Sequence, residues 1–126
     1  MLKLFKKEQP ATAEAPFPGE HTALDGSAAV VAMETAGGEA AGAYPITPST
    51  QMGEGFAAAV AAGRPNVHGR RLVFFEPEGE HAAAAVTAGM SMVGLRSTNF
   101  SSGQGIAYMH ESLYACLLYT SDAADE

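Results

Sequence analysis

The sequence lacks several features that mark common classes of function. Among its 126 residues there is no tryptophan and a single cysteine, so no internal disulfide can form. No apolar run approaches the ~20 residues that a membrane-spanning helix needs. The seven Lys and Arg residues are outnumbered by fourteen Asp and Glu residues, and no basic stripe is present to meet phosphates. We therefore expect no membrane and no nucleic-acid partner, and no Cys/His spacing indicates a metal site.

Small residues dominate what the sequence does contain. The hydrophobic fraction is 47%, yet only ten residues are Phe or Tyr, and alanine and glycine supply much of the rest. This composition suits thin, closely packed helices lying on a sheet. The length allows one domain that is large enough to bury a core.

The two ends of the chain do not follow the pattern of its middle. Residues 1–22 are polar and rich in Pro, Ala, Glu and Lys, which predicts a flexible leader. Residues 116–126 (CLLYTSDAADE) break the preceding helical periodicity and back-translate as a sequencing-adaptor sequence. We expect this tail, which holds the only cysteine, to be non-native. The domain at 23–115 is then expected to be truncated, with the natural chain continuing past Ala115.

The middle of the chain alternates between helical and strand patterns. Helices are expected at 27–36, 50–62, 80–92 and 106–115, and strands at 39–44, 71–76 and 95–100. Asp25 or Ser27 is expected to cap the first helix, and Ser49 or Thr50 the second. The segment RLVFFE is the clearest strand, because its continuous apolar run is typical of a buried parallel strand. The alternation predicts an α/β fold in which a parallel sheet is flanked by helices.

Three loops follow the predicted strands, and in such sheets ligands bind at the carboxyl ends of the strands. The first loop lies in AYPITPST, where Pro45 and Pro48 fix their own φ and push Tyr44 and Thr47 into extended conformations. Thr47 is then held between rigid neighbours, with a hydroxyl that can donate to a substrate carbonyl or carboxylate. Taken alone, the loop fits an ordinary proline-bounded turn better.

The second and third loops also carry polar groups. EPEGEH places Glu76, Glu78 and Glu80 ahead of a helix, where acids are common because the helix dipole favours them. The functional alternative is one carboxylate in a dry cleft that shares a proton with a ligand nitrogen. The third loop, SSGQG, has the composition of a phosphate-binding nest but lacks the lysine and the spacing of a P-loop.

Together, the three loops resemble the N-terminal domain of the 2-oxoacid:ferredoxin or flavodoxin oxidoreductases. The matching features are YPITPS, the E-x-E cluster, the Ala-rich helix and the Ser/Gly-Gln-Gly loop, within Leu24 to Ala115. The resemblance implies a thiamine diphosphate-binding (pyrimidine module) fold, incomplete at its C-terminus. The enzyme would oxidatively decarboxylate pyruvate or a related 2-oxoacid in the cytoplasm. The alternatives are another thiamine-dependent decarboxylase or transketolase-like enzyme, or a non-catalytic α/β ligand-binding module.

The resemblance also implies roles for particular residues. Glu80 would be the catalytic glutamate that bonds the cofactor's pyrimidine nitrogen, with Gln104 and Gly105 also in the cofactor site. Thr47 would face the 2-oxoacid substrate, with Pro45 and Ile46 beside it.

The remaining parts of such an enzyme are expected outside this chain. A missing domain or subunit would bind the diphosphate and Mg²⁺, and iron–sulfur clusters elsewhere would pass electrons to ferredoxin or flavodoxin. No metal ligand is expected within the chain, and the full enzyme is expected to be an oligomer.

Overall fold

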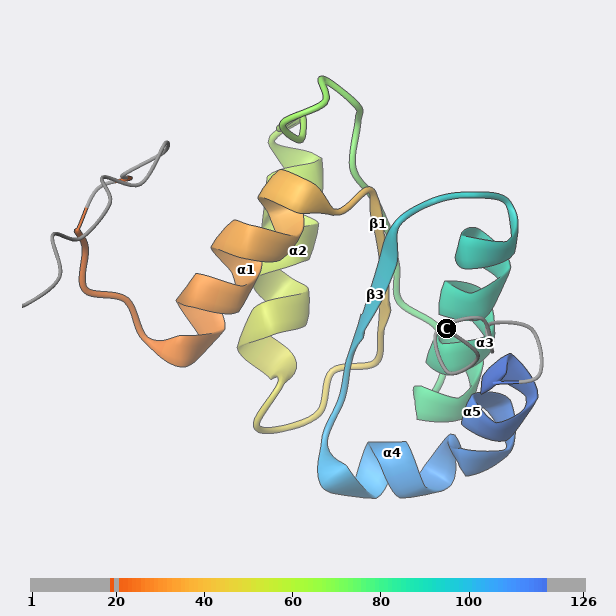
Figure 1. Ribbon diagram of the computed structural model, residues 1–126. Coiled ribbons are helices and arrows are strands. Elements are labelled where there is room, and N and C mark those ends of the chain that lie inside the picture. The colour runs from red at the N-terminus through yellow and green to blue at the C-terminus, as the bar shows by residue number, and fades with distance from the viewer. Residues whose placement is uncertain (1–18, 20, 118–126) are drawn as a thin grey trace, which may run out of the picture.

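The computed structural model describes residue 19 and residues 21–117, which form a parallel sheet with helices on both faces (Figure 1). The helices are α1 (Gly26–Gly37), α2 (Thr50–Ala61), α3 (Glu80–Met92), α4 (Gly103–Tyr108) and α5 (His110–Leu117). The strands are β1 (Ala40–Ala43), β2 (Val73–Phe75) and β3 (Ser97–Phe100). The predicted α/β class is confirmed. Most of the predicted leader, and residues 118–126 of the predicted non-native tail, lie outside the described residues.

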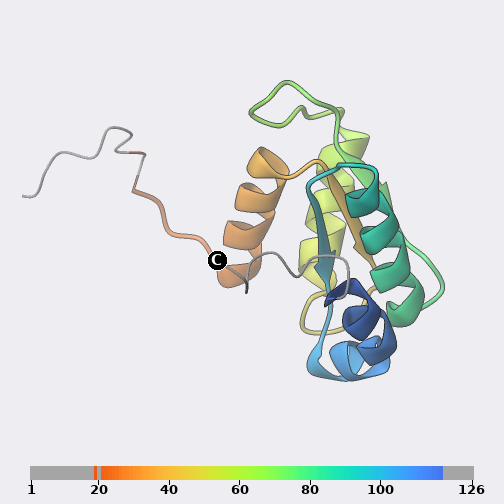
Figure 2. The same cartoon turned by 45° about the vertical axis from the view of Figure 1, so that its right-hand side comes forward.

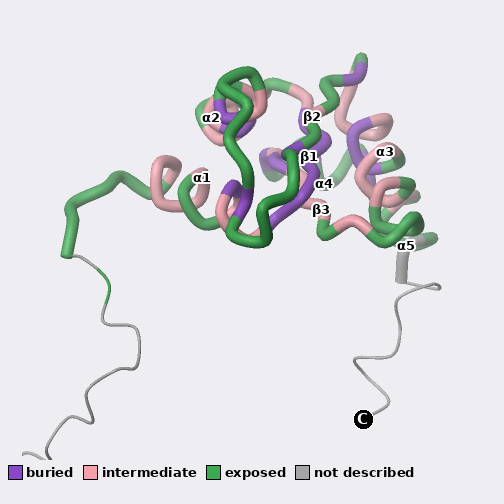
Figure 3. The backbone as a smooth tube through the Cα atoms, turned by 90° about the horizontal axis from the view of Figure 1, so that it is seen from above, coloured by how far each residue is buried: buried purple, intermediate pink, exposed green. Residues whose placement is uncertain are grey.

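The three strands are parallel, in the order β2-β1-β3. Ala41 of the central strand pairs with Phe74 on one side and Thr98 on the other, and all four residues of β1 are buried. Helices α1 and α2 lie on one side of the sheet, and α3 and α5 lie on the other (Figures 2 and 3). Because the strands run in one direction, the loops that follow them gather at the carboxyl ends of the strands, which we call the carboxyl edge of the sheet.

Small residues in β1 let α3 lie close to the sheet. A Cβ placed on Gly42 would lie 2.6 Å from Thr87 Oγ1 and 3.1 Å from the Ala83 carbonyl oxygen of α3. On the other face, the Phe56 ring centroid lies 6.2 Å from those of Phe74 and Phe100, which forms the core. The expected pattern of thin helices on a sheet is therefore confirmed on the α3 face.

The prediction that RLVFFE is a buried strand is wrong. It forms β2, a short edge strand in which the side chains of Val73 and Phe75 are 45% and 52% exposed. Helix α3 packs on β1 and β3, so that only Phe74 of β2 packs into the core. A continuous apolar run indicates a strand without indicating its place in the sheet.

The N-caps predicted from the sequence are confirmed only in part. Asp25 caps α1 as predicted, since its Oδ1 accepts a hydrogen bond from Ala28 N at 2.8 Å. Ser49 occupies the N-cap position of α2 but makes no side-chain cap; its Oγ instead donates to the Ile46 carbonyl at 2.8 Å. Helix α3 spans the predicted residues, and Gly94 follows it at φ +89, a left-handed conformation that favours glycine.

The predicted single helix at 106–115 is also wrong. The chain turns helical at Gly103, because Ser102 Oγ accepts a hydrogen bond from Gly105 N at 3.2 Å and so caps α4. The helical pattern is interrupted at Met109, and α5 then runs to Leu117. Among the described residues, no helix has the length and apolar character needed to cross a membrane.

A buried carboxylate joins the strands at their amino-terminal ends, opposite the loops that follow them. Glu39, only 7% exposed, accepts a hydrogen bond from Arg96 N at 2.9 Å and pairs with the Arg70 guanidinium. The bond from the Arg96 backbone, followed by the bond from Arg70, holds the pKa of Glu39 below its ordinary value. Glu39 thereby connects the segments that lead into β2 and β3 to the start of β1.

Gly42→Ala is expected to lower the free energy of unfolding by about 1–3 kcal/mol, because the added methyl overpacks the contact between α3 and β1. Gly53→Ala is the matched control: its new Cβ would meet atoms no closer than 3.5 Å, and alanine favours the helix. Urea unfolding of both variants checks this. An equal stability for the two variants would contradict the close packing described for β1.

Glu39→Gln is expected to destabilise the chain at neutral pH, with a loss that shrinks as the pH falls. The folded-state pKa of Glu39 is lowered, so its contribution is present above the unfolded-state pKa and disappears as the pH drops through the folded value. Denaturant titrations at a series of pH values measure the difference. Glu54→Gln, at an exposed position of α2, is the control. Its difference from the wild type in free energy of unfolding should not shrink as the pH falls.

Candidate active site

The three loops singled out from the sequence meet at the carboxyl edge of the sheet, the lower end in Figure 1. The loop after β1 leads into α2, the loop after β2 into α3, and the residues after β3 into α4. Parallel strands thus bring together segments that are far apart in the chain, as the sequence predicted.

Glu80 is the first residue of α3, preceded by Gly79 at the N-cap position, and it is partly buried. Its side chain packs against the third loop: a Cβ placed on Gly105 would lie 2.8 Å from Glu80 Cγ and 2.0 Å from Ser101 Oγ. Only glycine permits this close approach. The structure therefore brings Glu80 and Gly105 together, two residues assigned to the cofactor site on the resemblance.

Helix α4 packs beside the start of α3. The rings of His81 and Tyr108 lie edge to face with centroids 6.1 Å apart, and a Cβ on Gly79 would lie 3.9 Å from Tyr108 Cε1. Gln104 lies in the first turn of α4 and is exposed. Its side chain is thus accessible from the same end of the fold as Glu80.

The first loop is held by its own hydrogen bonds. The backbone N–H and the hydroxyl of Ser49 both donate to the Ile46 carbonyl, each at 2.8 Å. The Thr47–Pro48 peptide bond is cis, and Thr47 is exposed between these fixed neighbours. Within the described residues, Thr47 and Glu80 share no hydrogen bond. The structure places them at the same edge of the sheet but does not bring them into contact.

A pocket of about 80 Å³ opens beside the first loop. Its lining combines that loop with α2 and the end of β2: Ala43, Tyr44, Pro45, Ser49, Thr50, Gly53, Glu54, Ala57, Phe74 and Glu76. The carboxylates next to the first loop are thus Glu54 and Glu76, and neither Thr47 nor Glu80 lines this pocket. In the described part of the chain, no group of three or more His, Cys, Asp or Glu residues could hold a metal ion.

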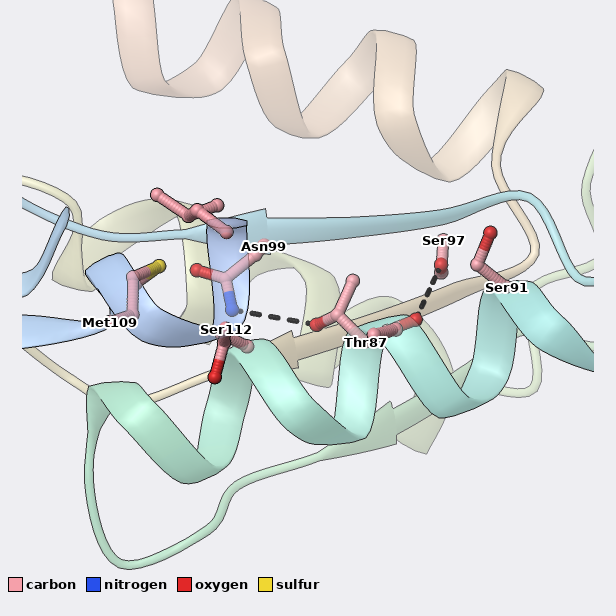
Figure 4. A pocket seen from close by; sticks show the side chains of 9 residues that line it. Thr87, Ser91, Ser97, Asn99, Met109 and Ser112 are labelled. Atoms are coloured by element: carbon pink, nitrogen blue, oxygen red, sulfur yellow. Dashed lines mark hydrogen bonds between the residues drawn. The ribbon is translucent and has the colours of Figure 1, made fainter. Parts of the chain in front are cut away.

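A larger pocket, of about 200 Å³, lies between α3, β3 and α5 (Figure 4). Most of its hydroxyl and amide groups already bond within the protein. Thr87 Oγ1 donates to the Ala83 carbonyl at 2.8 Å and accepts from Asn99 Nδ2 at 3.4 Å, and Ser97 Oγ donates to the Thr87 carbonyl at 3.0 Å. These bonds fasten α3 to the strands and satisfy Thr87, Ser97 and Asn99 within the protein.

Sequence reasoning missed Ser101. Its Oγ is buried and has no hydrogen-bond partner among the described residues. The adjacent Ser102 is engaged as the cap of α4. The sequence does not distinguish the two serines of SSGQG. Only the turn into α4 decides that Ser102 caps the helix and that Ser101 is left without a partner among the described residues.

Comparison with known proteins shows the family of the chain. The family model of the thiamine diphosphate-binding domain of pyruvate flavodoxin/ferredoxin oxidoreductase matches residues 31–120. A pyruvate-flavodoxin oxidoreductase of Nostoc sp. is 37% identical over 91 residues, which cover 72% of this chain and 8% of that protein. A pyruvate:ferredoxin oxidoreductase of Moorella thermoacetica is 36% identical over 91 residues, again 72% of this chain and 8% of that protein.

A shorter relative matches a comparable stretch. The pyruvate synthase subunit PorA of Thermotoga maritima is 36% identical over 101 residues, 79% of this chain and 24% of that subunit. The chain therefore spans less than a tenth of the long relatives and about a quarter of this one. The family match covers most of the chain, and the chain belongs to the thiamine diphosphate-binding domain family of the pyruvate flavodoxin/ferredoxin oxidoreductases.

Proposed function

We propose that this domain holds the aminopyrimidine part of thiamine diphosphate in an enzyme that oxidatively decarboxylates pyruvate or a related 2-oxoacid. The family match supports the cofactor, and the names of the relatives support the reaction class. The observation that carries the proposal is the position of Glu80. It is the first residue of α3, at the carboxyl edge of the sheet, and its Cγ lies against Gly105 of the third loop.

The residues present fit a heterocyclic ring with hydrogen-bonding nitrogens. Glu80 offers an acceptor or a shared proton, Ser101 Oγ is a buried hydroxyl with no partner among the described residues, and Gly105 lets these two side chains approach each other. In this assignment the Glu80 carboxylate shares a proton with the ring nitrogen, with Gln104 and Gly105 alongside. When bound, thiamine diphosphate supplies the electron sink for loss of CO₂ from a 2-oxoacid.

The first loop is assigned to the substrate. Thr47 presents an exposed hydroxyl on a loop whose shape is set by Pro45 and by the two bonds to the Ile46 carbonyl. That hydroxyl donates to the carbonyl or carboxylate of the 2-oxoacid, while Pro45 and Ile46 flank it. A loop fixed in advance loses little entropy when the substrate binds.

The rest of the enzyme completes the site. Ile106 and Tyr108, on α4 next to the start of α3, are 53% and 65% exposed, as expected of a surface that another domain covers. We assign the diphosphate and Mg²⁺ to that domain or subunit, and the iron–sulfur clusters to other parts of an oligomeric, cytoplasmic enzyme. Ferredoxin or flavodoxin is the electron acceptor, in line with the names of the relatives.

Glu80→Gln in the full-length enzyme that carries this domain is expected to abolish exchange of the cofactor's thiazolium proton, because the amide cannot share the proton that the carboxyl holds. The control is Glu78→Gln, at an exposed position of the same loop, which should leave exchange unchanged. Exchange is measured by NMR in deuterated buffer. Wild-type exchange in a folded Glu80→Gln variant would refute the assignment.

Thr47→Val removes the hydroxyl at nearly constant volume and is expected to lower kcat/KM for the 2-oxoacid by about tenfold or more, the equivalent of one lost hydrogen bond to a charged group. The affinity for thiamine diphosphate should stay unchanged. Thr47→Ser keeps the hydroxyl and is expected to retain most of the activity. Loss of cofactor affinity with normal substrate turnover would contradict a substrate role for Thr47.

A further inference from the structure

We propose that Ser101 positions Glu80 by donating its hydroxyl hydrogen bond to the Glu80 carboxylate. This inference rests on the proposed function, because it explains how the cofactor-binding carboxylate is held. Ser101 is here a positioning residue: it acts on the chemistry through Glu80.

The Ser101 hydroxyl is free to donate a hydrogen bond. Its oxygen is buried and has no hydrogen-bond partner among the described residues. A buried hydroxyl without a partner costs roughly 1–3 kcal/mol, and folded proteins rarely leave one in that state. Ser101 Oγ is also the one atom of this kind in the part of the chain that the structure describes. The Ser101 hydroxyl is thus available as a donor to a group beside it.

Gly105 brings the side chains of Ser101 and Glu80 close together. Ser101 Oγ and Glu80 Cγ both enter the space where a side chain at position 105 would begin, at 2.0 and 2.8 Å from that point. The glycine thus allows a residue after β3 to meet the first residue of α3. The Glu80 carboxylate is one bond beyond Cγ, so rotation of its terminal torsions carries an oxygen toward the Ser101 hydroxyl.

The donor and acceptor capacities of the two groups set the direction of the bond. An ionised carboxylate only accepts, whereas a serine hydroxyl carries one donor, so the bond runs from Ser101 to Glu80. The neighbouring Ser102 has a different place, since its oxygen accepts from Gly105 N and caps α4. Donation to the carboxylate favours the form of Glu80 that accepts a hydrogen bond. It also fixes which carboxylate oxygen faces the cofactor's ring nitrogen.

Other titratable groups near Glu80 define the background against which this effect is measured. They are Glu76 and Glu78 in the preceding loop, His81 on α3, Tyr108 on α4, and His110, Glu111 and Tyr114 on α5. All are present in every variant below, so a difference between variants reports on the serine.

The test is the pH dependence of thiamine diphosphate affinity, measured by calorimetry on the full-length enzyme with Mg²⁺. In Ser101→Ala the acid-side midpoint is expected to rise by about one pH unit, since one charge-assisted hydrogen bond is lost. Ser102→Ala is the matched control; it removes the α4 cap and lowers thermal stability, but leaves the midpoint in place. In the Glu80→Gln background, Ser101→Ala is expected to cause no shift.

Two results would overturn the inference. An unchanged midpoint in Ser101→Ala, with or without a uniform loss of affinity, would show that the hydroxyl does not act on Glu80. An equal shift in the Glu80→Gln background would show that it acts on another group. Failure of the proposed function is separate: it appears as normal proton exchange in Glu80→Gln itself, whatever Ser101→Ala does.

Discussion

The close contact between α3 and the central strand determines where everything else in this domain lies. Strand β1 consists only of Ala and Gly, and at Gly42 the absence of a side chain lets Thr87 approach the strand backbone. Thr87 then bonds within α3 and receives the amide of Asn99 from β3. This packing fixes the position of α3 on the sheet. Its first residue, Glu80, consequently reaches the edge at which the strands end.

The same use of small residues recurs at the site. Gly105 allows Glu80 and Ser101 to occupy neighbouring space, as Gly42 allows the helix to meet the strand. At the opposite edge, Glu39 binds the segments that lead into β2 and β3 by charge-assisted hydrogen bonds. One end of the sheet is thus fixed by a satisfied carboxylate. The other end presents Glu80, a carboxylate that the proposed function assigns to a ligand.

The sequence predicted the parallel sheet, the bounds of α3 and the meeting of three loops, because periodicity and loop chemistry report on local structure. It failed where a property depends on distant contacts. RLVFFE looks buried, yet its exposure depends on which strands α3 covers. The start of α4 depended on Ser102 reaching Gly105 N, and the pairing of Glu80 with the third loop depended on Gly105. The roles of Glu80 and Thr47 came from the family resemblance and stay predictions.

The proposed function depends above all on Glu80 as the carboxylate that meets the cofactor's pyrimidine nitrogen. A crystal structure of the full-length enzyme with thiamine diphosphate and Mg²⁺ would show that contact. We expect a Glu80 carboxylate oxygen within about 3 Å of that nitrogen, with the Ser101 hydroxyl on the same carboxylate. A cofactor whose pyrimidine nitrogen meets Glu76, Glu78 or a residue outside this domain, with Glu80 turned to solvent, would contradict it.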